Sequence, residues 1–270
     1  MKAPGPSVAL LTHLALLDAL VPVMRAAGEL IEAVRVAGFE ARGKADGSSV
    51  TEADEAAERL IVTALARLDT APIVAEEAHA AGHRAVAADR FWLIDPLDGT
   101  RDFIAGRAAY SVNIGLIDGG VPVLGLVLSP RDGILWAGAA GHGAFRQRPG
   151  EAREAIAVRH DHVPPTVVVS HSHLDDETKA YLARMGLVQL EPAGSSLKFC
   201  RLAEGSADVY PRYGPTMEWD TAAGDAVLRA AGGMMVGPSG DAFAYNKPGH
   251  RNGAFLAVGD GGLIATLPPL

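Results

Sequence analysis

Hydrophobic residues along the chain follow two different periods, which divide it into helical and extended segments. Residues 8–37 carry apolar side chains at helical spacing, and this predicts one long helix bent near Pro22. After a polar, glycine-containing link, Thr51 precedes a second helical pattern, EADEAAERLIVTALARL. Thr51 suits the N-cap of this second helix, and the acidic residues that follow it complement the helix dipole.

Short apolar runs at 72–75 and 91–94 predict strands that end in acidic residues. From 110 to 146, apolar segments alternate with Gly, Pro and Asp, which predicts an antiparallel meander. Beyond the polar segment 147–155, strand and helix patterns alternate as in an α/β layer. Strands are expected at 166–170, 187–191 and 207–212, and helices at 174–185, 195–205 and 219–233. We therefore expect an N-terminal α+β subdomain over residues 1–152 and a C-terminal α/β subdomain over residues 153–270.

Composition narrows the class of protein. Of 270 residues, 49% are hydrophobic and 21% are charged, which is enough for a large core. The net charge of −8 argues against a surface that coats nucleic acid. The single cysteine, Cys200, excludes an internal disulfide and is expected to be a small buried residue in a reducing compartment. The N-terminal apolar run is interrupted by polar residues and Pro22, so we expect neither a membrane span nor a cleaved leader. The sequence predicts a cytoplasmic protein and leaves peripheral association with the inner membrane open.

Acidic residues stand at the ends of several predicted elements: Asp54, Glu76, Asp95, Asp98 and Asp220. Each has an ordinary structural explanation, such as an N-cap, a favourable helix-dipole charge or a solvated turn. If the fold gathers them, however, their repulsion must be relieved by protonation or by cations. Carboxylate oxygens suit Mg²⁺ as ligands.

The segment WLIDPLDGTRDF combines two of these acids with a turn. Asp95 could bridge two metal ions, while the Leu97 carbonyl and Asp98 each bind one. Gly99 and Thr100 then begin a helix or tight turn whose backbone N–H groups can hold a phosphate oxygen. The Thr100 hydroxyl can position a metal-bound water. Two metals beside a phosphate form an apparatus for hydrolysis.

The order of these motifs resembles the inositol monophosphatase superfamily of metal-dependent, lithium-sensitive phosphatases. The resemblance extends roughly from residue 10 to 258 and is carried by TEAD (51–54), EE (76–77), WLIDPLDGTRDF (92–103) and WDTAAGDAV (219–227). Three further segments are similar to the CysQ subgroup, the 3'(2'),5'-bisphosphate nucleotidases. These are SHSHLDDET (170–178), SSLKFCRLAEGSADVYPRYGPTMEWDTAAGDAV (195–227) and YNKPGHRNGAFLA (245–257).

The resemblance implies a mixed α/β (α+β) fold, the layered αβαβα sandwich of the sugar phosphatases. It implies Mg²⁺-dependent hydrolysis of the 3'-phosphate of 3'-phosphoadenosine 5'-phosphate, or of its sulfated form, in sulfur metabolism. An inositol- or sugar-monophosphate phosphatase is the alternative enzyme, and an inactive metal- or anion-binding relative is the alternative outside catalysis. Substrate breadth and the choice between monomer and homodimer stay open.

The resemblance also implies roles for individual residues. Glu76, Asp95 and the Leu97 carbonyl would hold a first Mg²⁺, and Asp95, Asp98 and Asp220 a second. A third, weaker ion would lie beside Glu76. The N-terminal subdomain would thus supply most of the metal ligands, and the C-terminal subdomain would add Asp220.

Catalysis and substrate binding are implied for further residues. Asp54 and Thr100 would activate the attacking water, with Glu76 as a further catalytic residue and Glu77 beside the ligand. Lys198 and Arg212 would balance the second phosphate of the substrate, although solvated positions are their ordinary explanation. The expected substrate contacts are Gly99, Thr100, His173, Ser195, Ser196, Lys198, Arg212 and Asp220. Departures from the family pattern, among them Ala75 and His250, touch no expected metal ligand.

Overall fold

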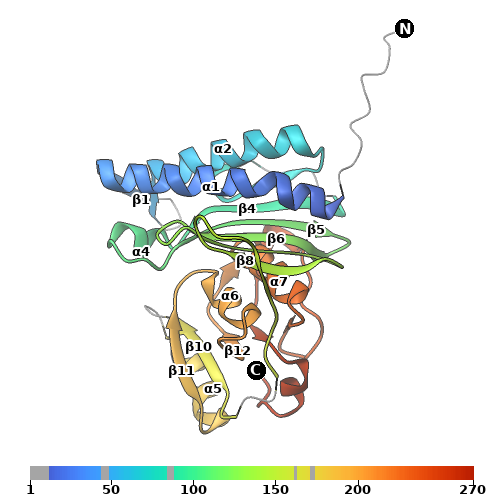
Figure 1. Cartoon of the computed structure of the whole chain (residues 1–270). Coiled ribbons are helices and arrows are strands. Elements are labelled where there is room, and N and C mark those ends of the chain that lie inside the picture. Colours follow the sequence, from blue (N-terminus) through green and yellow to red (C-terminus); the bar gives the residue numbers. More distant parts are fainter. Residues whose placement is uncertain (1–11, 44–48, 84–87, 161–162, 171–173) are drawn as a thin grey trace.

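The computed structural model describes residues 12–43, 49–83, 88–160, 163–170 and 174–270. Its elements form five layers, in which helices and sheets alternate (Figure 1). The layers, in order, are helices α1 and α2, a seven-stranded sheet, helices α6 and α7, a five-stranded sheet, and helix α5. The expected αβαβα sandwich is confirmed.

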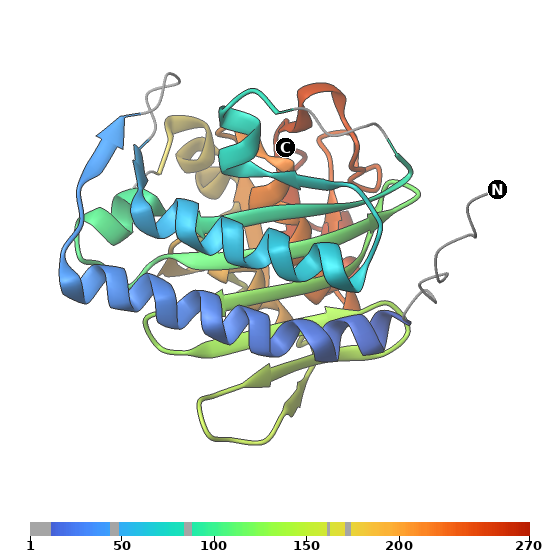
Figure 2. The same cartoon turned by 90° about the horizontal axis from the view of Figure 1, so that it is seen from above.

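Two long helices form the first layer and lie side by side across one face of the larger sheet (Figure 2). Helix α1 (His13–Ala37) begins at its N-cap Thr12 and continues through Pro22. Helix α2 (Glu52–Leu68) begins at Thr51, as expected from the sequence. Their apolar faces, including Leu20 and Ile61, are fully buried against the sheet.

The seven-stranded sheet has the order β3-β4-β5-β6-β7-β8-β9. Strands β3 and β4 are parallel and every other neighbouring pair is antiparallel, so the expected meander is confirmed. The strands are β3 (Ile73–Ala75), β4 (Arg90–Asp98), β5 (Ser111–Asp118), β6 (Val121–Ser129), β7 (Ile134–Ala139), β8 (Gly143–Gln147) and β9 (Glu154–Ile156). Strand β9 still pairs with β8, so the first sheet extends past the boundary expected at residues 152 and 153. The division into two subdomains stays a proposal.

The five-stranded sheet has the order β11-β10-β12-β16-β14. Its strands are β10 (Thr166–Ser170), β11 (Gln189–Ala193), β12 (Val209–Arg212), β14 (Met234–Val236) and β16 (Phe255–Val258). Helix α5 (Asp176–Met185) packs on its outer face, and α6 (Leu197–Ala203) and α7 (Glu218–Ala230) lie between the two sheets. The short elements are β1 (Ala41–Gly43), β2 (Ser49–Thr51), α3 (Glu76–Ala80), α4 (Thr100–Ile104), β13 (Thr216–Met217), β15 (Arg251–Asn252), and the 3₁₀ turns η1 (Pro248–His250) and η2 (Gly261–Ala265).

Helix α7 approaches the large sheet closely because three paired glycines leave space for it. Gly115, Gly125 and Gly138 stand opposite one another on β5, β6 and β7. A Cβ atom at Gly125 would lie 2.2 Å from the Ala223 carbonyl oxygen of α7. The absence of side chains in this row therefore sets the depth of α7, and with it the position of the α7 N-terminus.

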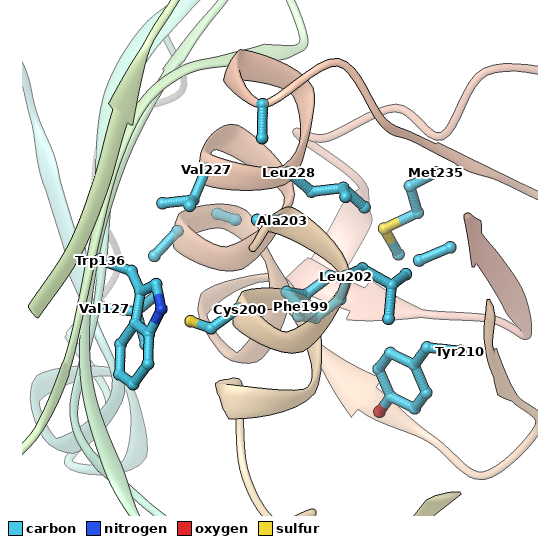
Figure 3. Packing of buried hydrophobic residues seen from close by; sticks show 14 of the residues in the cluster. Val127, Trp136, Phe199, Cys200, Leu202, Ala203, Tyr210, Val227, Leu228 and Met235 are labelled. Carbon is cyan, nitrogen blue, oxygen red and sulfur yellow. The ribbon is translucent and has the colours of Figure 1, made fainter. Parts of the chain in front are cut away.

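The core between the two sheets contains the single cysteine. Cys200 is fully buried on α6 and belongs to the same cluster as Phe199 and as Val127 and Trp136 of the large sheet (Figure 3). Its expected role as a small buried residue is confirmed. Among the helices of the described chain, none has the length and apolar character needed to span a bilayer.

Candidate active site

A one-residue bulge brings Asp95 and Asp98 to the same face of the large sheet. Asp95 pairs with Asn113 and Asp98 with Ser111, so three steps along β4 match two steps along β5. In a regular strand, residues three apart point to opposite faces. The extra residue cancels this alternation, as bulges do. Both carboxylates therefore share the face on which Gly115 accommodates α7.

Asp98 is held by the loop that precedes α6. Its Oδ2 accepts hydrogen bonds from the Ser195 hydroxyl at 2.7 Å and from the Ser196 amide at 2.8 Å. The Ser196 hydroxyl lies 2.6 Å from the Asp220 carbonyl oxygen and 3.1 Å from Asp98 Oδ2. Ser195 has a φ of 54°, a left-handed conformation that is uncommon outside glycine. These contacts join the two halves of the chain at the site.

Asp54 and Thr100 are in contact, as the resemblance implied. Thr100 Oγ1 lies 3.1 Å from Asp54 Oδ1 and 3.1 Å from the Leu97 carbonyl oxygen. The other carboxylate oxygen of Asp54 accepts hydrogen bonds from the Thr51 amide at 2.8 Å and the Thr51 hydroxyl at 2.6 Å. Burial raises the pKa of Asp54, and the hydrogen bonds from Thr51 and Thr100 oppose that rise. Asp54 is thus both a helix-capping residue and a partner of Thr100.

Asp220 completes the acidic group from the first turn of α7. Its Oδ2 accepts a hydrogen bond from the Met217 amide at 2.7 Å. Burial and the charges of Asp98 and Glu76 raise the pKa of Asp220. Burial, followed by the charges of Glu76, Asp98 and Asp220, likewise raises the pKa of Asp95. Four of the five acidic residues that were expected to meet, Glu76, Asp95, Asp98 and Asp220, therefore lie close enough to interact electrostatically.

The group fits a hard cation by its chemistry. In the described part of the chain, no three acidic, histidine or cysteine side chains close around one point as a finished ion cage. Burial and then the repulsion among the carboxylates raise the pKa of Asp95, and a cation among the four carboxylates would relieve that repulsion. Only oxygen donors are present in this group, and such a donor set suits Mg²⁺, Mn²⁺ or Ca²⁺.

The backbone turn after Asp98 requires glycine. Gly99 has a φ of 95°, and a Cβ atom there would lie 2.8 Å from the Ala109 carbonyl oxygen. Gly99 is the N-cap of α4, and Thr100 is its first residue. The tight turn brings the start of α4 beside the acidic group, where the sequence predicts a phosphate-binding site.

A pocket of about 800 Å³ opens beside Asp98 and Asp220. Lys198, Arg212 and Tyr210 also line it, and Arg101 borders it from α4. Acidic and basic side chains therefore both line the pocket.

Lys198 is 4% exposed, which makes it an unusual lysine. Its Nζ donates to the Ser195 carbonyl at 2.7 Å and lies 5.2 Å from the centre of the Tyr210 ring. Burial lowers the pKa of Lys198 to about 8, although the charge of Asp98 opposes this. Arg212 Nε donates to the Gly214 carbonyl at 3.1 Å. The ordinary explanation of Lys198 as a solvated helix residue is therefore wrong. Of the other expected substrate contacts, His173 lies outside the described residues.

Glu58 was not among the expected site residues, and it supports the residue on α3 that is expected to bind metal. Glu58 is 8% exposed, and its two carboxylate oxygens accept the amides of Glu77 and Ala78 at 2.7 and 2.8 Å. It therefore fixes the first turn of α3, which begins at Glu76. A signal was available, because Glu58 lies four residues after Asp54 on the same helical face.

Glu218 supports the first turn of α7 in a similar way and was also missed. It is fully buried and lies 2.8 Å from His250 and 3.0 Å from Lys247. Burial raises the pKa of Glu218, but the hydrogen bonds with His250 and Lys247 outweigh it and hold the pKa below its usual value. His250, which departs from the family pattern, is thus a structural partner of the helix that carries Asp220.

Comparison with known families accounts for this arrangement. The family model described as the inositol monophosphatase family matches residues 14–267. The chain belongs to the inositol monophosphatase family. Members of this family are metal-dependent phosphatases, and the motifs that carried the resemblance are the segments that form the acidic group.

Individual relatives are similar over most of their length. The chain is 44% identical to the 3'(2'),5'-bisphosphate nucleotidase CysQ of Escherichia coli strain K12, over 87% of this chain and 98% of the relative. The crystal structure of CysQ from Bacteroides thetaiotaomicron matches with a TM-score of 0.76 at 33% identity, over 90% of this chain and 97% of that one. An inositol monophosphatase from Thermotoga maritima matches with a TM-score of 0.75 at 26% identity, over 93% and 94% of the two chains.

Proposed function

We propose that this protein is a Mg²⁺-dependent 3'(2'),5'-bisphosphate nucleotidase. Its substrate is 3'-phosphoadenosine 5'-phosphate, or the sulfated form of that nucleotide, and its products are AMP, or adenylyl sulfate, and phosphate. The observation that carries the proposal is a pocket lined by Asp98 and Asp220 together with Lys198 and Arg212. A bisphosphate needs a second basic site apart from the phosphate that is cleaved, and this pocket supplies one. The similarity to CysQ proteins over most of the chain supports the same substrate class.

The acidic group would hold two or three Mg²⁺ ions. Glu76, Asp95 and the Leu97 carbonyl would hold the first ion, and Asp95, Asp98 and Asp220 would hold the second. The bound ions would lower the pKa of a water molecule and neutralise charge on the leaving oxygen. Cations would also reverse the local field, which explains how a chain with a net charge of −8 binds a polyanion.

Asp54 and Thr100 handle the proton of the attacking water. Thr100 Oγ1 lies 3.1 Å from Asp54 Oδ1, so the threonine can donate its hydrogen to the carboxylate. Its oxygen is then free to accept a hydrogen bond from water and to orient that water toward phosphorus. Thr51 fixes the carboxylate by bonding its other oxygen at 2.6 Å. The amides of Gly99 and Thr100 hold the phosphate that is cleaved.

The remaining phosphate binds at Lys198 and Arg212. Arg212 is permanently charged and can form two parallel hydrogen bonds with a phosphate. His173 and Asp220 complete the expected substrate contacts. Ser195 and Ser196 act at the edge of this site, since their contacts with Asp98 and Asp220 couple the substrate side of the pocket to the metal side.

Phosphate release in Mg²⁺ tests the proposal directly. Purified protein is given 3'-phosphoadenosine 5'-phosphate or inositol 1-phosphate at equal concentrations. A large preference for the nucleotide is expected, and Arg212→Ala should reduce that preference more than it reduces turnover of inositol 1-phosphate. A preference for inositol 1-phosphate would keep the metal site but overturn the assignment of substrate. No turnover of either compound would overturn the enzymatic proposal.

A further inference from the structure

Two buried residues of β5 extend the contacts of Asp98 into the large sheet. Ser111 and Asn113 are both fully buried. Ser111 Oγ contacts Ser195 Oγ, and it lies 3.1 Å from Asn113 Oδ1. Ser195 Oγ in turn lies 2.7 Å from Asp98 Oδ2. A continuous row of polar groups therefore leads from Asn113 through two serines to the carboxylate.

Counting hydrogens fixes the direction of this row. A carboxylate that binds a cation is ionised and can only accept, so Ser195 must donate its single hydrogen to Asp98. Ser195 can then only accept from Ser111, which uses the single hydrogen of Ser111. Ser111 has none left for Asn113, and Asn113 must instead present a donor to Ser111. Each hydroxyl in the row thus donates toward the carboxylate.

The side-chain amide of Asn113 agrees with this requirement once it is rotated by half a turn. With Oδ1 beside Ser111, the Nδ2 group is buried and lacks any hydrogen-bond partner in the described part of the chain. Oxygen and nitrogen of such an amide are assigned from the hydrogen-bond network and not from shape. The rotated amide places Nδ2 beside Ser111, so that Nδ2 gains an acceptor. Every contact in the row then contains one hydrogen.

We infer that Asn113 and Ser111 are positioning residues, which through Ser195 fix the ionised Asp98 in the orientation that binds a divalent cation. This inference rests on the proposed role of Asp98 as a metal ligand. The register between β4 and β5 explains why these two residues can position Asp98, because Ser111 and Asn113 are the strand partners of Asp98 and Asp95. The left-handed backbone of Ser195, with a φ of 54°, is the conformation that delivers its hydroxyl between the two strands.

Binding of Mn²⁺ to the free protein, followed by electron paramagnetic resonance without nucleotide, tests the relay. Loss of an outer partner typically weakens metal binding or activity about 10- to 100-fold. Ser111→Ala should weaken Mn²⁺ binding about tenfold, at the lower end of that range. Adding Asn113→Ala to Ser111→Ala should cause no further loss, because the row is already broken. Ser129→Ala removes another fully buried serine hydroxyl from the same sheet and should leave Mn²⁺ affinity unchanged.

Asn113→Asp separates the two orientations of the amide. Aspartate keeps the shape and an oxygen beside Ser111, and in its ionised form it can only accept a hydrogen bond. If Nδ2 is the required donor, Mn²⁺ binding weakens even though the added negative charge would by itself favour a cation. Unchanged or tighter binding in Asn113→Asp would overturn the orientation, and unchanged binding in Ser111→Ala would overturn the whole relay. Neither readout depends on nucleotide turnover, so a failed substrate assignment would be seen separately. Should Asn113→Asp fail to fold, the Ser111→Ala result decides alone.

Discussion

The row of glycines beneath α7 should tolerate no added carbon. In Gly125→Ala the new Cβ would lie 2.2 Å from the Ala223 carbonyl oxygen and 2.8 Å from the Ala226 Cβ. The first neighbour is backbone, so rotation of a side chain cannot relieve the contact. Helix α7 would have to move away from the sheet, although it is held on its other side by α6 and the second sheet.

Two opposing effects determine how far Gly125→Ala lowers the free energy of unfolding. Overpacking a core costs about 1–3 kcal/mol, and a contact with backbone belongs at the upper end of that range. Alanine restricts the unfolded chain more than glycine does, which offsets about 0.4–1 kcal/mol of the loss. The expected net loss is about 2 kcal/mol, which corresponds to a fall in melting temperature of about 4–8 °C for a protein of this size.

Thermal unfolding of the variant and of a matched glycine variant measures this difference. Gly253 is exposed, and nothing lies within 4 Å of a Cβ added there, so Gly253→Ala should keep the wild-type melting temperature. Since α7 begins two residues before Asp220, Gly125→Ala should also raise the Mg²⁺ concentration needed for half-maximal phosphate release. Equal melting temperatures for the two variants would refute the claim that the glycine row sets the depth of α7.

Three further changes test other parts of the site and the fold. Asp95→Asn should abolish phosphate release while the circular dichroism spectrum stays unchanged, and retained turnover would contradict the bridging role of Asp95. Because the pKa of Lys198 is lowered by burial to about 8, the lysine loses its charge above that pH, and kcat/KM for the bisphosphate should fall there. Lys198→Met should lower kcat/KM at pH 7 and should abolish the fall of kcat/KM above pH 8. If that fall persists in the variant, a group other than Lys198 causes it. Asp69 is buried, which raises its pKa, but hydrogen bonds led by Arg90 at 3.0 Å outweigh this and hold the pKa below its usual value. Its contribution to stability is therefore present above pH about 4 and is lost as the pH falls through the lowered pKa. Asp69→Asn should lower the urea midpoint at pH 7, and the difference in midpoint from the wild type should become smaller in acid. A difference that does not depend on pH would exclude the ionised carboxylate as its cause.

Local patterns in the sequence are sufficient to predict the helices and strands and to indicate the acidic residues of the site. Thr51 was predicted as an N-cap because its residue type and the acids after it act within one helical turn. Asp54, Asp95 and Asp220 were recognised because each stands where an apolar pattern begins or ends. Local chemistry decides such positions, so neighbouring residues carry the necessary information.

Supporting residues could not be predicted because their partners are distant in the chain. The position of Glu58, four residues after Asp54 on the same helical face, places it near the site, but no local pattern identifies its partners as the amides of α3, 19 and 20 residues later. Ser111 and Asn113 read as ordinary polar positions in a strand until the register with β4 places them opposite Asp98 and Asp95. Gly125 reads as a turn signal or a weak strand residue until α7 is seen to lie against it.

A single rule unites the four aspartates of the site and explains how an acidic group can be built without basic partners. In each, one carboxylate oxygen accepts a backbone N–H, and the donors are the amides of Thr51, Leu97, Ser196 and Met217 for Asp54, Asp95, Asp98 and Asp220 respectively. Such bonds favour the charged form of a carboxylate, and they orient it without adding a positive side chain. In Asp54 the other oxygen accepts a hydrogen bond from Thr100. A lysine or arginine in the same place would have neutralised the carboxylates and displaced the cation that they suit. Because a main-chain amide holds each of the four carboxylates, loss of a neighbouring hydroxyl removes only part of their hydrogen bonding, whether that hydroxyl belongs to Thr51 or Thr100 at Asp54 or to the row behind Ser195 at Asp98.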